Sequence, residues 1–82
     1  MNVRCTKLLG KYIKRLRLKR GLNLYTVAHM IGITYQMLSL IELGKVSVNY
    51  HNMWNLAQIY GVSINDLYKS MQLKTLYKEK IK

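Results

Sequence analysis

The stretch from residue 24 to residue 43, LYTVAHMIGITYQMLSLIEL, decides the fold of this chain. Apolar and small side chains recur at helical spacing in each half of it, at Val27, Ala28, Ile31, Leu38 and Ile41. Between the two halves, Gly32 can adopt the left-handed conformation that ends a helix, Ile33 can enter the core, and Thr34 can cap a second helix. The pattern predicts two short helices that cross over a tight turn.

These residues, and those that follow them, resemble the helix-turn-helix of the lambda-repressor-like (Cro/Xre-type) DNA-binding family. The resemblance covers roughly residues 9–68 and continues through Glu42-x-Gly44-Lys45 and Leu56-Ala57-x-x-Tyr60-Gly61-Val62-Ser63. It implies an all-α, compact five-helix domain in which the second short helix, about residues 35–43, enters the major groove of DNA. Periodicity alone predicts only a small helical domain.

The length and charge of the chain limit its organisation and partners. Its 82 residues suffice for one domain, and 14 Lys and Arg against 3 Asp and Glu give a net charge of +11. This excess indicates a polyanionic partner, although a basic surface can also serve solubility alone. We expect the DNA-binding domain to occupy residues 1–70, and residues 71–82 to form a basic extension.

Cysteine content and hydropathy indicate the compartment. Cys5 is the single cysteine and cannot form an intrachain disulfide. The sequence shows no secretory signal and no run of about 18 apolar residues that would span a membrane. We therefore expect a soluble protein of the cytoplasm that does not associate with membranes.

The basic residues are concentrated at the start of the chain. Residues 1–20 contain no acid, whereas residues 21–44 contain no Lys or Arg. The basic side chains of the first segment are Arg4, Lys7, Lys11, Lys14, Arg15, Arg17, Lys19 and Arg20. This division predicts that the first segment attracts phosphates and that the second is left to recognise bases or DNA shape. A solvated face and a cationic helix on a membrane are the alternatives.

Three further helices are expected around the central pair. The first would run from about Lys7 to Arg20, with Thr6 as its cap and with Leu9, Ile13 and Leu16 in the core. The fourth would follow Asn49 and bury Met53, Leu56, Ala57 and Tyr60, with Trp54 packing rather than stacking on bases. The fifth would begin at Ile64, after a capping box formed by Ser63 and Asp66.

Arg17 and Glu42 are candidates for a structural ion pair. Arg17 lies at the edge of the apolar stripe of the first helix, and Glu42 follows Leu38 by one helical turn. In the resembled family these two positions pair and tie the first helix to the end of the recognition helix. A phosphate-contacting arginine and a solvated glutamate are the alternative, but Glu42 is the only acid among residues 1–65.

Phosphate contacts are expected at Asn23, Leu24, Thr34 and Lys45. Asn23 can cap the second helix, whose first-turn amides carry partial positive charge and suit a phosphate. Leu24 stands where the family commonly has glutamine, so only its backbone N–H can contribute. Lys45 lies where the family touches phosphate, but Val46-Ser47-Val48 departs from the usual polar loop and leaves further loop contacts open.

Base contacts are expected from the outer face of the recognition helix, at Tyr35, Gln36, Ser39 and Leu40. Gln36 matches the donor and acceptor of adenine, Ser39 can bond to several bases, and Leu40 offers apolar contact to a thymine methyl. Leu40 and Leu43 are also unusual as outward-facing residues. They leave open a second function, a protein-interaction module of inhibitor or antitoxin type.

The final segment keeps a helical apolar stripe beyond the resemblance. Leu73, Leu76 and Tyr77, together with Ile59 on the fourth helix, are candidates for a dimer interface. A flexible tail is the alternative. We expect a transcriptional regulator, repressor-like, that binds a palindromic operator in double-stranded DNA as a homodimer.

The sequence gives no indication of catalysis or of a cofactor. His29 and His51 are solitary, and no acids or cysteines lie at a spacing that suits metal ligation. We expect no enzyme activity, no metal, no cofactor and no small-molecule ligand. RNA binding is a weaker alternative, because the aromatic sheet and the glycine loop of common RNA modules are missing.

Overall fold

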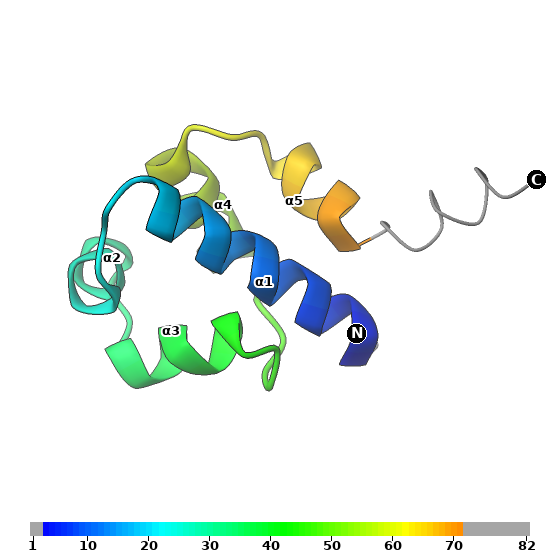
Figure 1. The fold of residues 1–82 in the computed structure, drawn as a ribbon, viewed down its shortest axis with the longest axis horizontal. Coiled ribbons are helices and arrows are strands. Elements are labelled where there is room, and N and C mark those ends of the chain that lie inside the picture. Colours follow the sequence, from blue (N-terminus) through cyan, green and yellow to red (C-terminus); the bar gives the residue numbers. More distant parts are fainter. Residues whose placement is uncertain (1–2, 72–82) are drawn as a thin grey trace, which may run out of the picture.

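Five α-helices make up the part of the chain that the structure, a computed structural model, describes, residues 3–71 (Figure 1). The helices are α1 (Val3–Lys19), α2 (Leu24–Ile31), α3 (Tyr35–Glu42), α4 (Tyr50–Tyr60) and α5 (Ile64–Met71). No strand occurs among these residues. The predicted all-α, five-helix fold is confirmed.

Local side chains set the helix ends where the sequence predicted them. Asn23, Thr34 and Asn49 each accept a hydrogen bond from the backbone N–H three residues on, at 2.8, 3.1 and 2.8 Å. At the start of α5, the Ser63 hydroxyl accepts from the Asp66 N–H at 3.0 Å, and the Asp66 carboxylate accepts from the Ser63 N–H at 3.1 Å. These contacts satisfy amides that a helix N-terminus leaves unpaired.

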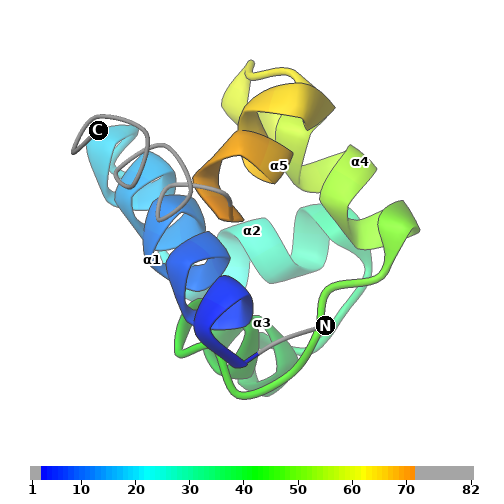
Figure 2. The same ribbon diagram turned by 90° about the vertical axis from the view of Figure 1, so that its right-hand side faces the viewer.

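A single apolar core joins all five helices. Its fully or nearly fully buried side chains include the core positions predicted for the first four helices, joined by Leu67 of α5: Leu9, Ile13, Leu16, Val27, Ala28, Ile31, Leu38, Ile41, Met53, Leu56, Ala57, Tyr60 and Leu67. α1 packs against both α3 and α5, which lie on different sides of it (Figures 1 and 2). The position of α3 therefore depends on α1.

Four details differ from the sequence predictions. α1 begins at Val3, so Thr6 is a buried residue within the helix and not its cap. Ile33 is only half-buried and packs against the core from outside. Trp54 is 48% exposed, because it lies on the side of α4 away from the core. Ile59, expected off the core face, is half-buried and packs against the core.

Two glycines let α1 and the end of α3 meet backbone to backbone. A Cβ atom at Gly10 would lie 2.5 Å from the Ile41 carbonyl oxygen and 2.6 Å from that of Glu42. Gly44 has a φ of +75°, and a Cβ there would lie 2.6 Å from the Lys7 Cα. Neither site has room for a side chain, so these glycines fix how closely the two helices approach.

Candidate nucleic-acid interface

The turn between α2 and α3 gives the recognition helix its direction. Gly32 ends α2 in the left-handed conformation, at φ 75° and ψ 32°, and the Thr34 hydroxyl caps α3. The chain bends by 107° between the two helices. This angle falls in the range of DNA-binding helix-turn-helix units, in which the second helix enters the major groove.

The α3 side chains of the predicted outward face differ in exposure. Gln36 is exposed, Tyr35 is 38% exposed, and Ser39 is half-buried. Leu40 is half-buried as well, whereas Leu43, the residue that ends α3, is 55% exposed. Of the expected pair of exposed leucines, Leu43 is exposed and Leu40 is only partly exposed.

Arg17 and Glu42 form a buried, two-bonded ion pair between α1 and α3. The Arg17 Nε donates to Glu42 Oε2 at 2.7 Å, and Arg17 Nη2 donates to Oε1 at 3.0 Å. Arg17 Nη1 also donates to the Leu22 carbonyl at 2.9 Å. The hydrogen bond with Glu42 raises the pKa of Arg17, so the guanidinium stays charged. The pair ties the end of α3 to α1 and neutralises the one acid near the interface.

A basic groove of about 310 Å³ lies between α1 and the outer side of α3. Its α1 wall carries Lys7, Lys11 and Lys14, which are exposed and stand one helical turn apart. Its α3 wall carries Ser39 and Leu43. The only acid in its lining is Glu42, which Arg17 neutralises. The groove therefore places a row of free ammonium groups beside the face expected to meet the bases.

The four predicted phosphate positions lie at the start of α2, at the cap of α3 and in the turn after α3. Asn23 and Leu24 lie at the N-terminus of α2, with the Asn23 side chain bonded to the Thr26 N–H. Thr34 caps α3. Lys45 follows the glycine turn after α3, its backbone N–H donates to the Leu40 carbonyl at 2.9 Å, and its side chain is exposed. This hydrogen bond holds the backbone of the turn, and so the point from which the Lys45 side chain extends.

Sequence reasoning missed an aromatic contact between α2 and α3. The rings of Tyr25 and Tyr35 lie with their centroids 4.3 Å apart and their planes tilted by 38°. The side-chain interaction with Tyr35 also raises the pKa of Tyr25. The two residues are separated by the turn and share no periodic pattern, so nothing in the sequence pairs them.

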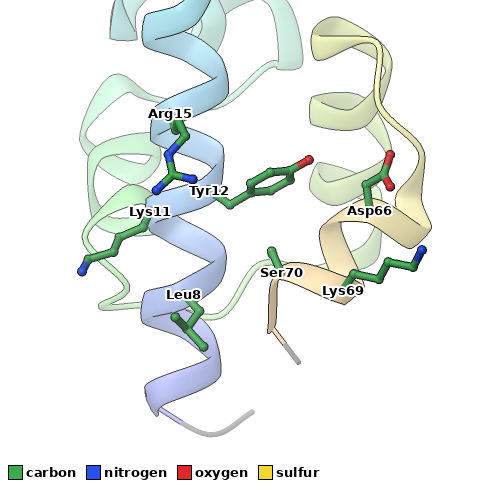
Figure 3. Close-up of a pocket in the computed structure, with 7 residues that line it drawn as sticks. All are labelled: Leu8, Lys11, Tyr12, Arg15, Asp66, Lys69 and Ser70. Atoms are coloured by element: carbon green, nitrogen blue, oxygen red, sulfur yellow. The ribbon is translucent and has the colours of Figure 1, made fainter. Parts of the chain in front are cut away.

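A second hollow, of about 520 Å³, lies between α1 and α5 (Figure 3). Tyr12 and Ser70 extend into the space between the helices, while Lys11 extends away from α5. Asp66 and Lys69 lie on its α5 side and bring opposite charges. The hollow is separated from α3 by α1, so it is no part of the candidate DNA surface.

Several sequence predictions concern residues or features away from this surface. The dimer candidates Leu73, Leu76 and Tyr77 lie outside the described residues. Within residues 3–71, no group of three or more His, Cys, Asp or Glu side chains could hold a metal ion. No single helix in this range is long and apolar enough to cross a membrane, and α2 and α3 meet those criteria only when combined across their bend.

Comparisons with known proteins agree with this geometry. The helix-turn-helix family model matches residues 13–67. The chain is 30% identical over 59 residues to the HTH-type transcriptional regulator PuuR of Escherichia coli K12, covering 72% of the chain and 32% of PuuR. It is 30% identical over 64 residues to the HTH-type transcriptional regulator DdrOP3 of Deinococcus deserti, covering 78% of the chain and 50% of DdrOP3.

A solved structure shows the same fold. The crystal structure of the clp gene regulator ClgR from Corynebacterium glutamicum aligns with a TM-score of 0.76 at 20% identity, covering 99% of this chain and 88% of ClgR. The chain thus matches a structure of nearly its own extent, but it spans only a third to a half of the curated relatives named above.

Proposed function

The chain belongs to the lambda-repressor-like helix-turn-helix family, and from that premise we propose that it binds double-stranded DNA at specific sequences and regulates transcription. The observation that carries the proposal is the groove beside α3. It sets the row Lys7, Lys11 and Lys14 next to an outer helix face that has no free charge.

In the proposed complex, α3 lies in the major groove, and the basic groups on either side of it hold the two phosphate backbones. Gln36 is exposed and presents the donor and acceptor that adenine matches, and Tyr35 and Ser39 lie beside it on the outer side. The amides at the start of α2, with Asn23, Leu24 and the Thr34 cap, are candidate contacts to one backbone. Leu24 lines the same groove as the α1 lysines, so these lysines face that backbone as well. Lys45, in the turn after α3, faces the other, and none of these contacts carries sequence information.

We further propose that the protein acts in the cytoplasm as a repressor-like homodimer at a palindromic operator. Two copies related by a twofold axis would present their α3 helices about one DNA turn, roughly 34 Å, apart. Residues 71–82, with Leu73, Leu76 and Tyr77, are the candidate interface, and Ile59 of α4, which packs against the core, is the remaining candidate. Sedimentation of the full chain and of a chain truncated after Met71 tests this assignment, since loss of a dimer on truncation supports it and monomers in both samples contradict it.

Selection from a pool of random duplexes, followed by gel shift, tests the proposed DNA binding. Enrichment of a defined motif, bound more tightly than a scrambled duplex, is the expected result. Failure to enrich any motif, together with a stable complex with another protein, would favour the alternative function of a protein-interaction module. The observation behind that alternative is the exposure of Leu43 and Met37 on α3, at 55% and 40%.

A further inference from the structure

Tyr25 and Tyr35 form an exposed aromatic pair across the helix-turn-helix. Tyr25 is the second residue of α2 and Tyr35 is the first residue of α3, and their ring centroids are 4.3 Å apart. The rings are 63% and 38% exposed, and neither belongs to the core. A contact between two solvated rings contributes little to folding, so its position calls for another explanation.

That position is the end of α3 that meets base edges. In helix-turn-helix proteins the N-terminal residues of the recognition helix contact the bases, while the preceding helix crosses the backbone. Tyr35 therefore lies at the end of α3 that is expected to contact bases, and Tyr25 lies at the end of α2 that is expected to contact a phosphate. A ring already held by a neighbour loses less conformational freedom on binding than a free one.

We propose that Tyr25 is a positioning residue for DNA recognition: its ring packs against Tyr35 and fixes the Tyr35 ring where it contacts the 5-methyl group of a thymine. This proposal rests on the proposed DNA-binding function. The thymine methyl is the apolar group that base edges present in the major groove. Leu40, the other apolar candidate on α3, is half-buried, so Tyr35 is the more accessible of the two.

The experiment removes single methyl groups from the DNA. Each thymine of the selected duplex is replaced in turn by deoxyuracil, which keeps the base pair and lacks only the 5-methyl group. At one thymine the wild-type protein should lose about fourfold in affinity, the factor that burial of one methyl group gives. Tyr35→Ala should bind the two duplexes equally, because the contacting ring is gone.

The Tyr25 variants test positioning. Tyr25→Ala should lower the methyl dependence at that thymine toward a factor of one, although Tyr25 does not touch the base. Tyr25→Phe and Tyr35→Phe should keep the fourfold dependence, because both retain the ring contact and lose only the hydroxyl interaction that raises the pKa of Tyr25. Thermal unfolding and binding to a scrambled duplex should change little in any variant, since both rings are exposed.

The outcomes separate this proposal from the function on which it rests. A motif bound equally well without any of its thymine methyls would overturn the methyl contact and leave sequence-specific binding intact. Full methyl dependence in folded Tyr25→Ala would overturn the positioning role. A pool that yields no motif would contradict the proposed function, and this proposal with it.

Discussion

Helices α1 and α3, which both line the basic groove, differ in what they present, although their backbones touch. α1 carries Lys7, Lys11 and Lys14 along the groove. α3 carries one charged residue, Glu42, and Arg17 neutralises it. The free positive charge of the groove is therefore placed beside the recognition helix and not on it. The comparison supports the proposed separation of roles, in which α1 and the turn after α3 would contact phosphates and α3 would discriminate among bases.

The largest expected effect on this comparison comes from breaking the Arg17–Glu42 ion pair, which links α1 to α3. Glu42→Gln leaves the Arg17 charge buried without its partner, and Arg17→Met strands the carboxylate. Each change should lower the free energy of unfolding by about 3–5 kcal/mol. Urea or thermal unfolding measures the loss, and it should be a large part of the stability of a small domain.

The double variant serves as the control for that prediction. Arg17→Met combined with Glu42→Gln removes both charges and should be less damaging than the sum of the single changes. Small losses that simply add would mean that the two side chains do not stabilise each other, and the ion pair would not be what fixes α3 against α1.

The next largest effect concerns the close approach of the two helices. Gly44→Ala adds a Cβ within 2.6 Å of the Lys7 backbone, so the turn after α3 must move away from α1. Gly32→Ala is the matched control, because Gly32 has the same φ of +75° and nothing within 4 Å of its Cβ position. Gly44→Ala should destabilise by about 1–3 kcal/mol more than Gly32→Ala. Equal losses in urea unfolding would show that only the backbone conformation matters.

A smaller effect should distinguish lysines within α1. Lys14 lines the groove beside α3, whereas Lys19, at the C-terminal end of the same helix, does not. Lys14→Gln should weaken binding to every duplex and reduce the slope of log affinity against log salt by about 0.9, the value for one phosphate. Lys19→Gln should leave the slope unchanged. Identical slopes for the two variants would mean that α1 attracts DNA only through net charge.

The elements that local chemistry determines could be predicted from the sequence. Asn23, Thr34 and Asn49 cap helices because each side chain reaches an amide only three residues away. The core followed from helical periodicity, because one face of each helix must be buried. The partnership of Arg17 and Glu42, 25 residues apart, came from the family resemblance, since spacing alone allowed an alternative.

Features that depend on how helices pack could not be predicted in this way. In the sequence, Gly10 is only an unfavourable residue inside a helix. The structure gives the reason for it, because the backbone at the end of α3 leaves no room for a side chain there. The contact between Tyr25 and Tyr35 depends on the bend between α2 and α3. Leu40 was placed outward by a helical wheel, which describes one helix and ignores the neighbours that cover part of that face.

The most direct test of the separation between phosphate contacts and base recognition compares Gln36→Ala with Lys45→Ala. Each variant is titrated with the selected duplex and with a scrambled duplex over a series of salt concentrations. Gln36→Ala should lose about 1–3 kcal/mol on the selected duplex, relax the preference at one base pair and leave scrambled DNA unaffected. Lys45→Ala should weaken binding to both duplexes alike and reduce the salt slope by about 0.9. If Gln36→Ala lowers both affinities equally, or neither, α3 does not read bases through its outer face.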